Sequence, residues 1–412
     1  MHHVLRKIRD WKYITLVPLV ILSCWRIISF PVWLVHSKRG LPSSPDGDWY
    51  LNHSRSMLDN FAISLNMNEI LYLGYNLLLT ALLAIFKDPV TVIYIQALTA
   101  SLAVIFVYLI AWTLFNQRTA IIASLLYLYN WEVTFWSTYL ISDSFFVSLL
   151  IVCVYLLIRA VDSRRTSYIS AFAIMALYMS LFRPAGIVIF LCMLLYVLSR
   201  MGRKSISAFW TKHRTILLGF AAFVILGLGL LYSRHVFDGF FASLQYNAKL
   251  VLYNLYAKGR VYDIATAYDY FYRPDYTIDI MDSLVFSFFI HNWDAVVILF
   301  FRRAVAFFGT WAWDNNLRNV ADYLFFSFRL LPAFLFSVGT IAAVRNHIIG
   351  RAAILWWIVF AVFVFCILLF IDAMYRYRFP AMPFIGIIAA YGLDRLISGG
   401  CSIALKIRTR SL

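Results

Sequence analysis

The chain has 412 residues, of which 63% are hydrophobic and 14% are charged, and its mean hydropathy is +0.78. This apolar share is well above the ~45–50% of ordinary soluble domains, so a soluble globular protein is excluded and a polytopic membrane protein is indicated. The formal net charge of +16 could suggest nucleic-acid binding, but Lys and Arg cluster in short connections between apolar runs. That pattern follows the positive-inside rule, so we expect membrane lipids and no nucleic acid as partners.

The N-terminal segment, MHHVLRKIRDWK, is basic and is followed by an apolar run from Tyr13 to Val35. The run is too long for a signal-peptide core and has no small-residue cleavage site, so it predicts an uncleaved first span. Because basic flanks stay in the cytoplasm, this span leads outward and the residues after it are extracytoplasmic.

The next apolar segment, residues 70–86, decides the topology of everything after it. Its sequence, ILYLGYNLLLTALLAIF, could cross a bilayer but only at the lower length limit. If it crossed, four basic connections would become extracytoplasmic, against the positive-inside rule. These are RAVDSRR (159–165), SRMGRK (199–204), KHR (212–214) and RNHIIGR (345–351). We therefore predict that residues 70–86 form a juxtamembrane helix that does not cross.

The remaining apolar runs then give about ten predicted transmembrane helices, with both termini in the cytoplasm. After Tyr13–Val35 they are 91–114, 119–136, 138–161, 167–182, 184–200, 214–232, 323–344, 352–371 and 380–398. The predicted fold is an all-α polytopic membrane protein with one transmembrane domain, residues 1–398. Residues 36–90 form a first extracytoplasmic loop with juxtamembrane helices, residues 234–321 a large later loop, and residues 399–412 a basic cytoplasmic tail.

The large loop contains an apolar stretch, Ala295 to Trp313, with Arg302 and Arg303 at its centre. Each arginine would cost roughly 2.5–3.5 kcal/mol at mid-bilayer, so we expect this stretch to lie flat on the outer face. Most acidic residues also map to the outer half of the chain or its loops. We therefore expect the functional site on the extracytoplasmic side.

The stretch Pro45 to Leu58, PDGDWYLNHSRSML, concentrates polar side chains beside the membrane. Ser44 can cap a helix that begins at Pro45, which leaves Asp46 in its first turn, where the helix dipole favours carboxylates. One face of that helix would carry Tyr50, Ser54, Met57 and Leu58, as in an amphipathic helix on a bilayer surface.

Two further acids lie at the outer level of the chain. Asp143 begins an apolar span, where an unpaired carboxylate is costly, so it is either a functional acid or a helix cap. Glu132 is a pairing partner or an interfacial residue. The candidate substrate-binding residues are Tyr50, His53 and Glu132.

Arginines form the complementary set on the outer face. They are Arg183, Arg302, Arg303, Arg376 and Arg378. A guanidinium group binds phosphate oxygens bidentately, so arginines at the lip of a membrane pocket suit a lipid phosphate, although interfacial anchoring is the alternative.

These motifs, and their order along the chain, resemble those of the GT-C class of polyprenyl-phosphate-sugar-dependent membrane glycosyltransferases. This class includes protein O-mannosyltransferases and aminoarabinose transferases. The segment PDGDWYLNHSRSML is similar to the first-loop pattern of that class, and STYLISDSFF (137–146) to the acid-containing start of a later span. YRYRFPAMP (375–383) resembles the Arg-x-x-Pro-x-x-Pro turn before the last span. In layout the similarity covers most of residues 10–398.

The resemblance implies an inverting sugar transfer from a polyprenyl-phosphate donor to a lipid, glycan or protein acceptor, with the site facing the periplasm or exterior of a bacterial inner membrane. By position, Asp46 would be the catalytic base and Asp143 a second acid that orients the acceptor or a metal. Arg376 and Arg378 would neutralise the donor phosphate. Gly47 separates Asp46 from Asp48, whereas many relatives have adjacent acids, so Asp48 remains a third catalytic candidate without a defined role.

No ligand spacing requires a cofactor, although Asp46, Asp48 and Asp143 could hold a divalent metal, Mg²⁺ or Mn²⁺. Two other functions remain open. A lipid-linked sugar flippase would explain intramembrane acids but predicts repeat symmetry and paired broken helices, which the sequence does not display. A polysaccharide polymerase or ligase shares the donor chemistry but would centre on arginines, without a first-loop Asp.

Overall fold

The computed structural model describes residues 2–37, 39–60, 66–201, 232–262, 265–266, 268–308, 318–368 and 374–410, with isolated residues between 207 and 230. Within these ranges every regular element is a helix, which confirms the all-α fold class. Nine of the 19 residues in the predicted span 214–232 lie outside the described residues.

The elements follow the chain from a long N-terminal helix to a long C-terminal one. They are α1 (His2–His36), α2 (Pro45–Asp59), α3 (Met67–Leu71), α4 (Leu73–Phe86), α5 (Pro89–Leu114), α6 (Gln117–Leu128), α7 (Trp131–Trp136), α8 (Ser142–Ser163), α9 (Thr166–Ser180), α10 (Pro184–Arg200), α12 (Asp238–Val251), the π-helix η1 (Leu252–Tyr256), α13 (Leu284–His291), α14 (Trp293–Phe308), α15 (Val320–Arg345), α16 (Ile349–Leu368), α17 (Met374–Tyr377), the 3₁₀-helix η3 (Phe379–Ala381) and α18 (Met382–Arg410).

Five of the described helices are long and apolar enough to span a bilayer, or up to seven if two bent pairs each form one span. The protein is therefore a multi-pass integral membrane protein, and the count of about ten remains a prediction. The predicted span 119–136 is wrong as one helix. Asn130 interrupts it, because its side chain accepts a hydrogen bond from the backbone N–H of Glu132 and starts α7.

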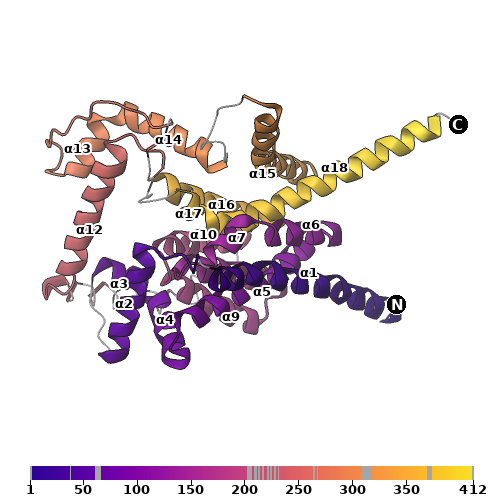
Figure 1. The fold of residues 1–412 in the computed structure, drawn as a ribbon, viewed down its shortest axis with the longest axis horizontal. Helices are drawn as coiled ribbons and strands as arrows, with labels where there is room; N and C mark the ends of the chain where they lie inside the picture. Colours follow the sequence, from indigo (N-terminus) through magenta and orange to yellow (C-terminus); the bar gives the residue numbers. More distant parts are fainter. Residues whose placement is uncertain are drawn as a thin grey trace.

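The two termini project from the same end of the bundle, and α2, α3, α12 and α13 lie at the opposite end (Figure 1). α1 and α5 run antiparallel, because Thr15 bonds Tyr108 near one end and Ser23 donates to the carbonyl oxygen of Ser101 further along. The start of α5 therefore lies beside the end of α1, away from the termini.

α4 begins and ends at that same far end. α5 and α8 run parallel, since Gln96 bonds the segment before α8 and Phe106 lies against Tyr155 further along. The chain returns through α9, and the backbone N–H of Gly74 in α4 donates to the carbonyl oxygen of Leu181, just past the end of α9. Because α5 starts only three residues after α4 ends, both ends of α4 lie on one side of the bundle.

α18 packs closely against α15 through glycines. A side chain on Gly339 would overlap the carbonyl oxygen of Ile388, and one on Gly392 would overlap that of Leu335. Small residues at a crossing let two helix backbones approach, which favours helix association in a membrane. This contact anchors the last span, which follows the turn that carries Arg376 and Arg378.

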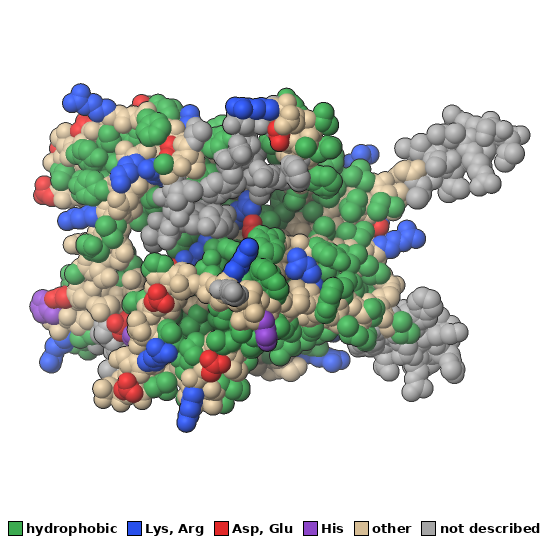
Figure 2. Space-filling model, viewed as in Figure 1, with side chains coloured by type: hydrophobic (Ala, Val, Ile, Leu, Met, Phe, Trp, Pro, Cys, Tyr) green, Lys and Arg blue, Asp and Glu red, His purple; other side chains and the backbone are tan. Residues whose placement is uncertain are grey.

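Acidic side chains gather mainly at the end that carries α2, α3, α12 and α13, whereas apolar side chains dominate the surface between this end and the termini (Figure 2). A charged end and an apolar middle are what a bilayer requires of a helical bundle. The polar end is therefore the part of the molecule in which to look for a site.

Candidate active site

α2 begins as the sequence predicts. Ser44 is extended, with φ −146°, and its Oγ accepts a hydrogen bond from the backbone N–H of Gly47 at 3.1 Å, while Pro45 occupies the first turn. A Cβ on Gly47 would lie 3.2 Å from the carbonyl oxygen of Leu140, so this glycine lets α2 approach the segment before α8. That approach brings Asp46 toward the start of α8.

Of the four residues predicted to share one face of α2, Tyr50, Ser54 and Met57 are buried and Leu58 is 44% exposed. The contact of this face with the bilayer surface stays a prediction. Tyr50 packs edge-on against Tyr75 of α4, with ring centroids 4.8 Å apart.

The start of α8 is held by a glutamine that the sequence analysis did not single out. Gln96 is fully buried in α5, and its Nε2 donates to the carbonyl oxygens of Trp136 (3.3 Å), Ser137 (3.1 Å) and Tyr139 (2.7 Å). These bonds fix the turn that precedes α8 and therefore the position of Asp143. The available signal was a single amide within the apolar run TVIYIQALTA.

Asp143 is a buried, ion-paired acid and not a helix cap, because the cap of α8 is Ile141. Its side chain is 0% exposed and pairs with Arg183, which precedes α10 and is itself buried. A buried carboxylate without a partner would be very costly, so Arg183 is what allows Asp143 to remain charged here.

Arg376 joins the first loop to α8. Its Nη1 donates to Oδ2 of Asp46 at 2.5 Å, and its Nε donates to Oδ2 of Asp143 at 3.1 Å. Burial works against the charge, but the carboxylates of Asp143 and Asp46 outweigh it and hold the pKa of Arg376 well above its ordinary value. Three sequence motifs that were predicted separately therefore meet at one guanidinium group.

Arg378 reaches a different acid. Its Nη2 donates to Oε1 of Glu132 at 2.7 Å, and its Nη1 to the carbonyl oxygen of Phe307 in α14 at 3.3 Å. The η3 turn, which directly follows Arg378, packs against α8, α16 and α18. Glu132 is thus a pairing partner, the first of the two roles that the sequence left open.

Arg302 and Arg303 contact the backbone of the large loop. Arg302 Nη1 donates to the carbonyl oxygens of Tyr268 (2.6 Å) and Asp269 (3.1 Å). Arg303 is buried, and its Nη2 donates to the carbonyl oxygen of Arg260 at 2.9 Å. In the structure neither arginine is placed with Asp46 and Arg376, and their phosphate-binding role stays a prediction.

The remaining candidates divide between a buried tyrosine and two peripheral residues. Burial raises the pKa of Tyr50 well above its ordinary value, so its phenol is neutral at physiological pH. His53 stacks on Trp49, with ring centroids 5.3 Å apart, and its Nε2 lies 3.9 Å from Oε2 of Glu69. Asp48 is exposed on the other side of α2 from Tyr50.

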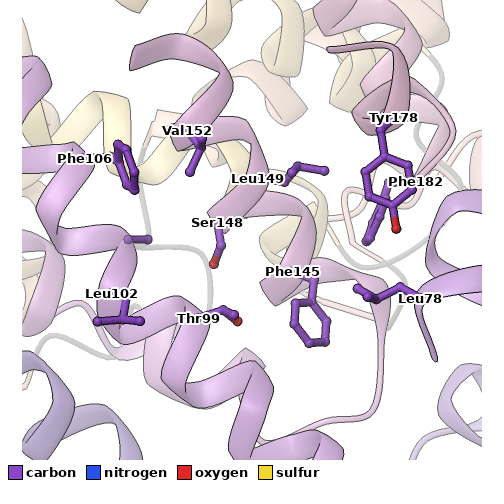
Figure 3. A pocket seen from close by; sticks show the side chains of 11 residues that line it. Leu78, Thr99, Leu102, Phe106, Phe145, Ser148, Leu149, Val152, Tyr178 and Phe182 are labelled. Carbon is purple, nitrogen blue, oxygen red and sulfur yellow. The ribbon is translucent and has the colours of Figure 1, made fainter. Parts of the chain in front are cut away.

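A cavity of about 270 Å³ lies next to this cluster, between α4, α5, α8 and α9 (Figure 3). Phe145 and Phe182 in its wall stand two residues after Asp143 and one before Arg183. Its hydroxyl groups bond backbone carbonyls, Thr99 to Gln96 and Ser148 to Ser144. The wall therefore offers little to a polar ligand and suits a hydrocarbon chain.

The acids do not fit a divalent metal in this arrangement. Asp46 and Asp143 both pair with Arg376, and Asp143 also with Arg183, so a cation between them would face two guanidinium groups. Among the described residues, no three Asp, Glu, His or Cys side chains converge as metal ligands would.

The family model described as dolichyl-phosphate-mannose-protein mannosyltransferase matches residues 73–227. No curated protein matches this chain. The matched range contains Asp143 and Arg183 but neither Asp46 nor Arg376, so the cluster found in the structure extends beyond it.

Among solved structures, the archaeal oligosaccharyltransferase AglB from Archaeoglobus fulgidus, in complex with an inhibitory peptide and a dolichol-phosphate, is similar with a TM-score of 0.54. The identity is 12%, over 97% of this chain and 52% of that chain. The apo form of the Archaeoglobus fulgidus oligosaccharyltransferase has a TM-score of 0.44 and 13% identity, over 96% of this chain and 52% of that one. This chain thus spans about half the length of the proteins that it matches. The chain therefore shares the fold of the archaeal oligosaccharyltransferase, and this fold and the family match agree with the expected resemblance to the GT-C class.

Proposed function

We propose that the protein is an inverting glycosyltransferase that moves a sugar from a polyprenyl-phosphate donor to a hydroxyl group of a lipid, glycan or protein acceptor. The observation that carries this proposal is the contact of Arg376 with both Asp46 and Asp143. It sets a half-exposed carboxylate next to a buried cation that can bind an anion, as acid–base transfer from a phosphate requires.

In the proposed reaction, the acceptor oxygen attacks the anomeric carbon from the face opposite the phosphate. The bond between that carbon and the phosphate oxygen breaks, and its electron pair leaves with the phosphate. Asp46 takes the proton of the acceptor hydroxyl. Arg376, with Arg378 nearby, stabilises the charge that develops on the departing phosphate.

The lipid nature of the donor is supported by two features. The family that matches residues 73–227 is named for a dolichyl-phosphate sugar, and the similar archaeal structure holds a dolichol-phosphate. The apolar cavity beside Phe145 and Phe182 is suited to isoprenoid units, because its wall is hydrocarbon and its hydroxyl groups are already bonded.

The reaction is proposed to take place on the extracytoplasmic face of a bacterial inner membrane. Both termini lie at one end of the bundle and the acid-rich helices at the other. Basic segments stay in the cytoplasm, so the basic N-terminus supports an exterior location for the opposite end, which carries Asp46 and Arg376.

The test is sugar transfer by the purified full chain in lipid nanodiscs, with polyprenyl-phosphate-linked sugars as donors and detection of released polyprenyl phosphate. Asp46→Asn keeps the shape but removes the base, so the rate should fall by roughly 10²–10⁴. Asp59→Asn, which changes an exposed acid at the end of the same helix, is the matched control and should keep its activity. Transfer by Asp46→Asn at the rate of the unsubstituted protein would refute the assignment of Asp46 as the base.

A further inference from the structure

The two carboxylates bound by Arg376 differ sharply in their surroundings. Asp143 is 0% exposed and also bound by Arg183, whereas the side chain of Asp46 is 47% exposed. The contact of Arg376 with Asp143 is therefore enclosed on all sides. Its contact with Asp46 is partly open, because the Asp46 side chain is about half exposed.

The oxygen of Asp46 that faces the site is occupied in this structure. Its Oδ2 accepts the hydrogen bond from Nη1 of Arg376 at 2.5 Å. A charge-assisted bond of this kind commits the oxygen to the guanidinium and not to the hydroxyl of an acceptor. The proposed base is thus engaged before any substrate is present.

A phosphate oxygen is a close substitute for this carboxylate oxygen. Both are anionic acceptors, and the planar guanidinium presents separate donors in a fixed fork. Arg376 can therefore keep Nε on Asp143 while Nη1 exchanges Asp46 for phosphate. Rotation of the Asp46 side chain is enough, because Ser44 holds the first turn of α2 in place.

The local charges favour an exchange over a simple addition. Asp46 and Asp143 balance Arg183 and Arg376, so the four side chains are neutral together. An added phosphate would bring uncompensated negative charge into a largely buried cluster, which is costly. Release of the more exposed carboxylate toward solvent relieves that cost.

We propose that Asp46 and the donor phosphate compete for Arg376, so that binding of the donor releases the catalytic base. This inference rests on the proposed function and adds an order of events to it. The donor binds first, Asp46 turns from Arg376 toward the entering acceptor, and transfer follows. Without donor, the base stays paired and the acceptor meets an inactive site.

The competition makes a specific prediction about affinity. Removing Asp46 removes the competitor, so Asp46→Ala should bind a polyprenyl phosphate more tightly, by about tenfold if a charge-assisted hydrogen bond is no longer displaced. Asp59→Ala is the matched control, since it removes an equal charge from an exposed position at the end of the same helix and should leave affinity unchanged. Arg376→Ala should lose binding.

The experiment measures the dissociation constant of farnesyl phosphate for the full chain in nanodiscs, with Asp46→Asn as a second variant that keeps the side-chain shape. Unchanged or weaker binding by both Asp46 variants would overturn the exchange, and so would equal tightening by Asp59→Ala. A different result tests the proposed function. If Asp46→Asn transfers sugar normally, the base assignment is wrong, whereas an inactive Asp46→Asn with unaltered affinity leaves the base in place and removes only the exchange.

Discussion

Replacing Asp143 by Leu should destabilise the protein strongly, because the change leaves a buried cation without its partner. Arg183 is 1% exposed and pairs with Asp143, and its guanidinium carbon also lies 5.3 Å from the centroid of the Tyr377 ring. Breaking a buried pair from one side costs about 3–5 kcal/mol, and a cation–π contact contributes only about 0.5–2 kcal/mol. The ring therefore cannot compensate.

Adding Arg183→Met to Asp143→Leu should recover most of that loss. Methionine has a similar length and no charge, so the double variant replaces a buried ion pair by apolar side chains. Such replacements are often neutral or stabilising. Arg376 keeps Asp46 as a partner in both variants, so the pair can be tested without emptying the cluster.

The assay is the free energy of unfolding in mixed detergent and denaturing surfactant, measured for the unsubstituted chain, both single variants and the double variant. The cycle should give a coupling of at least about 2 kcal/mol between Asp143 and Arg183. Additive losses would refute the reasoning, as would an Asp143→Leu chain within about 0.5 kcal/mol of the unsubstituted protein. Either result would mean that Arg183 does not depend on this carboxylate.

Three further predictions concern the frame around the cluster. Gln96→Leu removes the hydrogen bonds to the turn before α8, so the transfer rate should fall by about tenfold with a smaller change in KM; an unaltered rate would remove its positioning role. A cysteine in place of Lys87 should react with a membrane-impermeant reagent from outside, whereas labelling from the cytoplasm would mean that α4 crosses. Gly392→Leu should lower the unfolding temperature by forcing α15 from α18, and Gly399→Ala, with open space around it, should not; equal effects would contradict the close packing.

The fold could be predicted from the sequence where one local signal decides the structure. Ser44 and Pro45 predicted the start of α2, and the apolar runs predicted most helices. The break in 119–136 was missed because hydropathy continues across Asn130, while the capping bond that starts α7 is a local polar effect. A hydropathy pattern extends over many residues, so it does not detect a single side chain that ends the hydrogen bonding of a helix.

The site could be predicted as a set of residues but not as a set of pairs. Asp46, Asp143 and Arg376 were each identified, yet their contacts join residues 233 and 330 positions apart, which no periodicity encodes. Arg302 was predicted to bind phosphate because of its charge. That role stays a prediction, while its hydrogen bonds to loop carbonyl groups could not be predicted, because such acceptors exist at every residue and leave no trace in the sequence.

The joint position of these residues explains why an arginine, and not a lysine, suits position 376. One side chain must hold a buried acid from α8 and an exposed acid from α2 at the same time, and its Nε and Nη1 do so from one rigid plane. A lysine has a single flexible ammonium group, so moving toward a phosphate would mean leaving Asp143. The fork separates the two tasks, with Nε fixing the side chain to α8 and Nη1 left to exchange partners. The same geometry that stabilises the cluster therefore also equips it to respond to an anionic substrate.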